Sequence, residues 1–182
     1  GQDASVTHDD SIALGHNASV TRDDSIALGH NASATGVSSV ALGQDASVTH
    51  DDSIALGHNA LATGSASIAL GYNASAAGHY PIALGNYASA GDFSVALGNY
   101  ASATGVSSVA LGQSASATGT YSTALGRNAS AENDNEGILG GTGSSSTSKW
   151  IVPGSFTVNG TKNFEIPHPK PEKKATHVIR HG

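Results

Sequence analysis

The chain has 182 residues, of which 38% are hydrophobic and only 5% aromatic, with 23 glycines, one tryptophan, no cysteine and no methionine. The lack of cysteine excludes a disulfide scaffold and a thiolate metal site. Residues 1–140 contain two arginines and twelve acidic residues, whereas residues 141–182 contain six lysines and arginines and two acidic residues. The basic end carries no recognition motif, so we interpret it as a solvated surface and expect no nucleic-acid partner.

A five-residue motif, S-I-A-L-G, first stands at residues 11–15 and recurs, with Val for Ile in some copies, over residues 1–140. The closing glycines of its ten copies are 14 residues apart, except for one step of 13 between Gly85 and Gly98. A short period sustained over most of a chain is typical of a solenoid. An α-helix is excluded because glycine recurs in every copy and the apolar residues are two apart.

Each copy predicts two short strands and two turns. In the first strand, Ile12 and Leu14 share one face, and we expect that face to fill the interior. In the second strand, Ala18 and Val20 are expected to point inward, and residues 21–24 close the coil as a turn. The bulky positions predicted to be inward are Ile12, Ile26, Val40, Ile54, Ile68, Ile82, Val95, Val109 and Thr123, together with Leu14, Leu28, Leu42, Leu56, Leu70, Leu84, Leu97, Leu111 and Leu125.

The one-residue deletion falls within residues 86–93, a predicted turn, so strand register should survive it.

A single roll of this composition has little to hold it together. One coil buries large aliphatic groups worth a few kcal/mol at ~25 cal/mol per Å², whereas ordering its backbone costs about 1–2 kcal/mol per residue. We therefore expect an obligate oligomer.

The repeat S-[IV]-A-L-G-x-N-A-S-A resembles the head repeat of YadA-like trimeric autotransporter adhesins over residues 1–140. This resemblance implies an all-β fold, a trimeric left-handed parallel β-roll solenoid with 14-residue repeats, followed here by a small β-rich domain. It also implies that the Ile12 and Leu14 positions fill each roll, while small alanine faces allow close packing between chains. Leucine in place of isoleucine before the glycine is a conservative departure, and no neck motif, coiled-coil stalk or membrane anchor follows.

The predicted domains are a β-roll head or shaft at 1–140, a Gly/Ser-rich linker at 141–149 and a small C-terminal domain at 150–182. Within the last, residues 156–166 predict a hairpin, because alternating apolar residues flank Asn159-Gly160. Residues 160–169 are similar to the G-x-K-x-F-x-I-x-H-P stretch of phage, viral and bacterial fibres. In those proteins it often precedes a self-cleaving trimerisation chaperone, of which no continuation follows Gly182.

We assign no metal site and no catalytic site from the sequence. The pairs Asp9-Asp10, Asp23-Asp24 and Asp51-Asp52 recur at equal places, and we favour solvated turn carboxylates over a Ca²⁺ ladder. The slot that holds His16, His30 and His58 also holds Gln, Tyr, Asn and Arg, which indicates turn polarity rather than a metal site. No nucleophile elbow or phosphate-binding loop is present in the sequence. We expect that the protein is not an enzyme and that it binds no metal or cofactor.

The exposed aromatic residues of the later turns are the candidates for a lateral binding surface, although we favour turn packing between coils as the explanation of these residues. These residues are Tyr72, Tyr87, Phe93, Tyr100 and Tyr121.

The leading functional hypothesis is a surface-displayed, homotrimeric fibre or adhesin segment with a structural and multivalent binding role. Its partner would be a cell-surface or glycan receptor, and its place extracellular, on a cell or a virion. One alternative is the shaft of a virion or tail fibre with a host-recognition tip. A remote alternative is an ice-binding solenoid. No apolar run approaches the length of a membrane span, and we expect no membrane segment in this chain.

Overall fold

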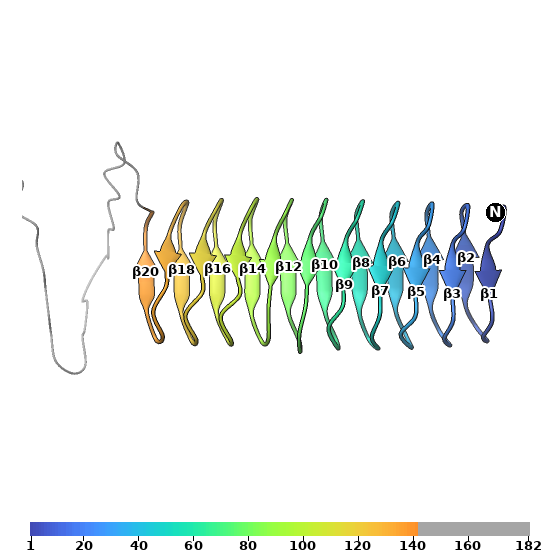
Figure 1. The fold of residues 1–182 in the computed structure, drawn as a ribbon, viewed down its shortest axis with the longest axis horizontal. Helices are drawn as coiled ribbons and strands as arrows, with labels where there is room; N and C mark the ends of the chain where they lie inside the picture. Colours follow the sequence, from blue (N-terminus) through green and yellow to red (C-terminus); the bar gives the residue numbers. More distant parts are fainter. Residues whose placement is uncertain (142–182) are drawn as a thin grey trace, which may run out of the picture. The chain divides into compact units, whose positions relative to one another are not determined.

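The computed structural model describes residues 1–141, which contain strands and turns and no helix. The strands form two parallel sheets of ten, and every coil of the chain adds one strand to each sheet (Figure 1). The predicted C-terminal domain, and all of the predicted linker except Gly141, lie outside the described residues. The solenoid prediction is thus confirmed over the ten repeats, with two short strands and two turns in each.

The first sheet is built from two-residue strands, which correspond to the second strand predicted for each copy. They are β1 Ser5–Val6, β3 Ser19–Val20, β5 Ser33–Ala34, β7 Ser47–Val48, β9 Leu61–Ala62, β11 Ser75–Ala76, β13 Ser89–Ala90, β15 Ser102–Ala103, β17 Ser116–Ala117 and β19 Ser130–Ala131.

The second sheet is built from three-residue strands, which contain the centre of the S-I-A-L-G motif. They are β2 Ile12–Leu14, β4 Ile26–Leu28, β6 Val40–Leu42, β8 Ile54–Leu56, β10 Ile68–Leu70, β12 Ile82–Leu84, β14 Val95–Leu97, β16 Val109–Leu111, β18 Thr123–Leu125 and β20 Gly137–Leu139.

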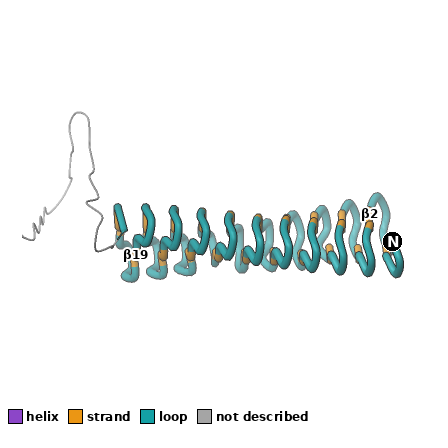
Figure 2. Tube along the Cα trace, turned by 90° about the horizontal axis from the view of Figure 1, so that it is seen from above, coloured by secondary structure: helices purple, strands orange, loops and turns teal. Residues whose placement is uncertain are grey.

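Register follows the sequence repeat throughout. Ile68 pairs with Ile54 on one side and with Ile82 on the other, each 14 residues away. Across the short coil, Ile82 still pairs with Val95, because the missing residue is taken from the turn that ends at Phe93. Turns and strands are bonded coil to coil by backbone hydrogen bonds such as Asn31 N–H to His16 C=O at 2.9 Å. Most of each coil is turn rather than strand, as Figure 2 shows.

The interior is lined by small side chains, and this overturns the predicted inward face of the first strand. The alanine at the centre of each three-residue strand is buried, as Ala69 is with no exposed surface, whereas Ile68 beside it is 36% exposed. The isoleucine, valine and leucine positions predicted to fill the roll, from Ile12 and Leu14 onward, therefore lie on its outer surface. The implied alanine faces between chains are likewise wrong, because these alanines form the core of a single roll.

The physical reason is the size of the coil. Strands of two and three residues joined by tight turns enclose a narrow space, which alanine, serine and an occasional valine such as Val20 and Val48 fill completely. A leucine in that space would be overpacked, so the bulky member of each alternating pair is turned outward. The second strand was predicted correctly, since Ala32 and Ala34 are buried.

The serine that opens each motif is also buried and has a structural role. The hydroxyl of Ser25 lies 2.8 Å from the carbonyl oxygen of Gly36 and 2.9 Å from that of Asp23. It also accepts a hydrogen bond of 3.2 Å from the backbone N–H of Ser39 in the next coil. Apart from Ser122, whose buried hydroxyl has no hydrogen-bond partner, these serines tie the end of a turn to its neighbours, which explains why serine recurs before the strand.

Candidate functional site

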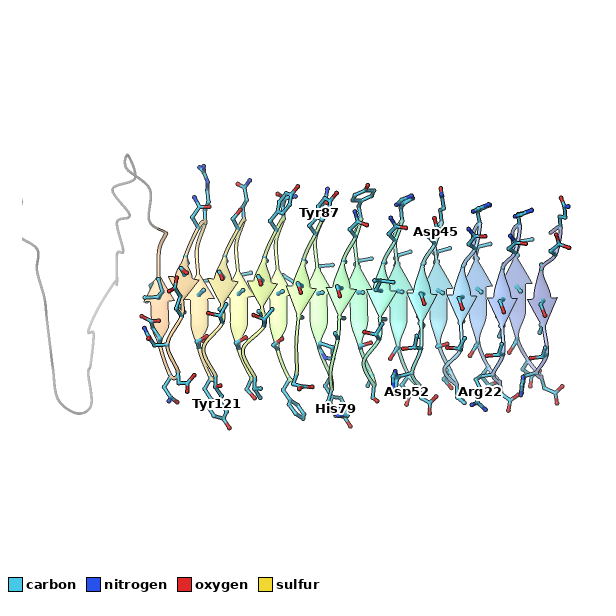
Figure 3. The ribbon with its side chains drawn as sticks, viewed as in Figure 1. Arg22, Asp45, Asp52, His79, Tyr87 and Tyr121 are labelled. Atoms are coloured by element: carbon cyan, nitrogen blue, oxygen red, sulfur yellow. The ribbon has the colours of Figure 1, made fainter. Side chains whose placement is uncertain are left out.

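Two rows of turns run along opposite sides of the roll, and they differ in chemistry. The row that follows the three-residue strands, at residues 15–17 and their equivalents, carries mainly amides and rings, and we name it the tyrosine edge. The row that follows the two-residue strands, at residues 21–24 and their equivalents, carries most of the carboxylates, and we name it the acidic edge. Figure 3 shows Asp45 and Tyr87 on the first and Arg22, Asp52 and Tyr121 on the second.

The structure divides the five predicted binding residues between these two edges. Tyr72, Tyr87 and Tyr100 lie on the tyrosine edge, 44%, 41% and 55% exposed. Phe93 and Tyr121 lie on the acidic edge, 54% and 64% exposed. A single ligand site cannot be formed by all five, so the structure brings together only the first three.

A ladder of four rings follows the tyrosine edge. The ring centroids of His58 and Tyr72 are 5.1 Å apart, those of Tyr72 and Tyr87 5.4 Å, and those of Tyr87 and Tyr100 4.9 Å. The rings of Tyr87 and Tyr100 are parallel within 7°, whereas Tyr72 meets Tyr87 at 70°. These spacings match the separation of neighbouring strands, so the ladder is a direct consequence of coil stacking. Sequence reasoning missed His58 as its first member.

A second, smaller aromatic group lies on the acidic edge, where Phe93 contacts Tyr80 at a centroid distance of 5.8 Å and His79 at 6.3 Å. Residues one coil apart in a solenoid are neighbours, and ring positions 13 to 15 residues apart are the signal that could have found both groups. Tyr121 has no ring partner among the described residues.

The backbone at most of these aromatic positions is unusual. Tyr87 and Tyr100 have φ of 55° and 56°, and Phe93 on the other edge has 55°. The position of Tyr87 and Tyr100 holds Asn17 and Asn59 in other coils, with φ of 53° and 55°, and the position of Phe93 holds Asn135, with φ of 59°. Asparagine tolerates the left-handed region, whereas a bulky side chain there costs on the order of 1 kcal/mol. Folding of the coil therefore does not require a ring at these positions.

The amides of the first coils form their own ladder. The side-chain amide of Asn17 donates to the carbonyl oxygen of Asn31 at 3.2 Å, and that of Asn31 donates to Asp45 at 2.9 Å. Two histidines stack alongside, since the rings of His16 and His30 are 5.1 Å apart. Asp45 ends the ladder, and the hydrogen bond from Asn31 is the main cause that lowers the pKa of its carboxyl below the usual 3.8.

This lowered pKa predicts a pH-dependent contribution to stability. A depressed carboxyl pKa stabilises the fold above the usual value, and that contribution is lost as pH falls below 3.8 through the lowered value. We expect the thermal midpoint of the wild type relative to that of Asp45→Asn to be higher at about pH 6 than at about pH 3. The variant has the same other carboxylates, so the difference between the two proteins isolates Asp45. An unchanged difference would contradict the assignment.

The acid pairs of the acidic edge, such as Asp23 and Asp24, are exposed. Three carboxylates have a structural partner, since each accepts a backbone N–H of the preceding coil. Asp51 accepts from Val37 at 2.8 Å, Asp92 from His79 at 2.7 Å and Asp134 from Thr120 at 2.8 Å. Within residues 1–141, no three His, Cys, Asp or Glu side chains are grouped so that they could hold a metal ion.

A third surface is apolar. The isoleucine and leucine side chains of the three-residue strands stand on the outer side of their sheet, and we name this surface the aliphatic face. Ile54 and Leu56 are 40% and 36% exposed, and Ile12 and Leu14 at the first coil are both 56% exposed. The eight coils from β2 to β16 contribute two such positions each in register, and β18 and β20 contribute one leucine each, so the face is continuous along the ten strands.

The repeat is matched by a family model described as YadA head domain repeat (2 copies), over residues 1–32, 34–60, 62–88, 103–129 and 117–135. The chain belongs to the YadA head-repeat family. The unmatched residues 89–102 of this YadA head chain contain the shortened turn at Phe93 and also Tyr100. This is the part of the roll that departs most from the family pattern.

A solved structure supports the same assignment. The collagen-binding domain of the Yersinia adhesin YadA is similar to this YadA head chain, with 28% identity, a TM-score of 0.56, and coverage of 84% of this chain and 78% of that one. The family and this neighbour are adhesins rather than enzymes. A search of curated proteins gave no match. The part of the chain that the structure describes holds no helix that is long and apolar enough to cross a membrane.

Proposed function

We propose that this chain is the head or shaft of a homotrimeric, surface-displayed adhesin that acts by binding and not by catalysis. The observation that supports the trimer is the aliphatic face, which a lone soluble roll would leave in contact with water along its whole length. Three rolls placed side by side around an axis would cover it, in a closed cyclic assembly. The threefold number comes from the resemblance to trimeric autotransporter adhesins.

Burial of the aliphatic face in an assembly would also supply the apolar contacts that the small interior of one roll lacks. A coil whose interior holds only alanine and serine gains little from burial within itself, so the larger gain must come from its outer isoleucine and leucine. Folding and assembly are then coupled, and a free monomer is only weakly stable.

The proposed mechanism is presentation on a stiff support. Parallel strands in unbroken register hold each edge at a fixed spacing, and the trimer repeats each edge three times. Weak contacts to a repetitive ligand then add by avidity. The ligand that the comparison suggests first is collagen, because the similar structure is a collagen-binding domain. Cell-surface display follows from the same comparison.

The test is the solution mass together with collagen binding. Light scattering should give a species of three times 18.0 kDa, with no concentration-dependent decay to monomer in the working range. Immobilised triple-helical collagen should retain this species, and heat-denatured collagen and albumin are the controls. A monodisperse, folded monomer would refute the trimer, and equal retention on all three surfaces would refute collagen as the ligand.

A further inference from the structure

We propose that the outer ring face of Tyr100, where the aromatic ladder ends, is a stacking site for a sugar ring of a neutral oligosaccharide. The site lies within one roll, and its threefold repetition rests on the proposed trimer. Residues of the ladder below it, His58, Tyr72 and Tyr87, supply the support and not the contact.

The ladder ends at Tyr100 because of the residue in the next coil. Ser114 occupies the same slot, with φ of 54°, and its small exposed side chain cannot stack on the ring. Tyr87 covers the other face at 4.9 Å and 7°, which leaves the face toward Ser114 without a ring partner among the described residues. Tyr100 is accordingly the most exposed of the three tyrosines on this edge, at 55%.

Stacking on neighbouring rings explains why the inner positions of the ladder hold aromatic residues, but it does not explain the ring at Tyr100. Stacking offsets the strain of a ring at positive φ for Tyr87, which has a ring on either side. Tyr100 bears the same strain with one ring partner, at a position where asparagine serves other coils. An exposed, supported and otherwise unnecessary aromatic ring is what ligand recognition by stacking requires.

The surroundings favour a neutral, hydroxyl-rich ligand. From Tyr72 to Ser114, the tyrosine edge carries no Asp, Glu, Lys or Arg, and its side chains are mainly amides, rings and hydroxyls. Asn99 and Gln113 flank the proposed site with amides that both donate and accept hydrogen bonds. An acidic sugar would meet the excess of carboxylates that residues 1–140 carry. The coil spacing of about 4.8 Å also places successive polar groups at roughly the length of one sugar ring.

The experiment uses a printed array of neutral and acidic glycans and four forms of the full chain. Wild type should bind one or more neutral glycans. Tyr100→Asn should lower that signal about tenfold, since one ring contact is lost in each of three rolls. Ser114→Tyr should also lower it about tenfold, because the added ring covers the proposed face. Tyr121→Asn, which removes a ring from an equivalent positive-φ slot on the acidic edge, should leave it unchanged.

Folding does not confound the two asparagine variants, because asparagine occupies the same positions in other coils and should not lower the thermal midpoint. Ser114→Tyr places a ring at a position that Tyr87 and Tyr100 already occupy in two other coils, and its thermal midpoint is measured beside its binding. An array on which no neutral glycan binds, or a Tyr100→Asn variant that binds like wild type, would overturn the proposal. A stronger signal for Ser114→Tyr would overturn it too, because it would assign binding to the ladder edges. Mass and collagen retention, measured on the same samples, report separately on the proposed function.

Discussion

Replacing Gly71 with alanine is expected to lower the free energy of unfolding by at least about 3 kcal/mol, because a methyl group there meets both backbone strain and a backbone clash. Gly71 has φ of +139°, a region that L residues rarely adopt. An added Cβ would lie 2.4 Å from the carbonyl oxygen of Gly85 in the next coil. Backbone strain and the backbone clash therefore add, and the two coils cannot move apart without breaking the ladder hydrogen bond from Gly85 N–H to Leu70 C=O.

The matched control is Gly137→Ala. Gly137 lies outside the positive-φ region, and an added Cβ meets nothing within 4 Å. Its effect on the free energy of unfolding should stay within about 1 kcal/mol in either direction, because the main change is in the backbone entropy of the unfolded chain. Circular dichroism melts at equal protein concentration should show a midpoint for Gly71→Ala lower by roughly 6–12 °C than for this control. Equal midpoints for the two variants would show that the glycine row does not hold the coils together.

Placing two charges on the aliphatic face should abolish assembly. In Ile68→Asp combined with Leu70→Asp, each roll of the proposed trimer would bring two carboxylates to the covered surface, where they have no partner. Each lost aliphatic contact is worth about 1.5–3 kcal/mol when fully buried. Light scattering should then report chains of 18.0 kDa or unfolded material in place of the trimer. Thermal stability should fall with it, because folding and assembly are coupled.

The control for this variant lies on the opposite sheet. Ser75 and Ser89 pair directly with each other in β11 and β13, and each alternates with a buried alanine. Ser75→Asp combined with Ser89→Asp adds the same charge to the roll and should retain the trimeric mass. If both double variants stay trimeric, the aliphatic face is not the interface, and a different surface must join the chains.

The repeat also shows how far such a sequence can be interpreted before a structure is known. The spacing of the closing glycines predicts ten coils, two strands in each and the pairing of every residue with the one 14 positions away. The pairing of Ile82 with Val95 confirms that the deletion is absorbed in a turn. These features depend only on the spacing of residues along the chain, and a single sequence is enough to show that spacing.

The sequence shows that the candidate binding residues lie in turns, but it does not show on which of the two turns of a coil each of them stands. Phe93 follows the two-residue strand β13, and Tyr87 follows the three-residue strand β12, so the rings stand on opposite edges. Their association within each edge depends on which neighbour fills the slot in the next coil. The end of the ladder at Tyr100 thus depends on Ser114 as much as on the tyrosine itself.

By itself the sequence determined the period, the strand register, the number of coils and the likeness to the YadA head repeat. Only the tertiary structure decided which face of the three-residue strands is inside. Alternation with a period of two separates Ile68 and Leu70 from Ala69 but does not say which set is buried. That choice is made by the width of the closed coil, which admits alanine and excludes leucine, and the excluded residues become the surface available for assembly.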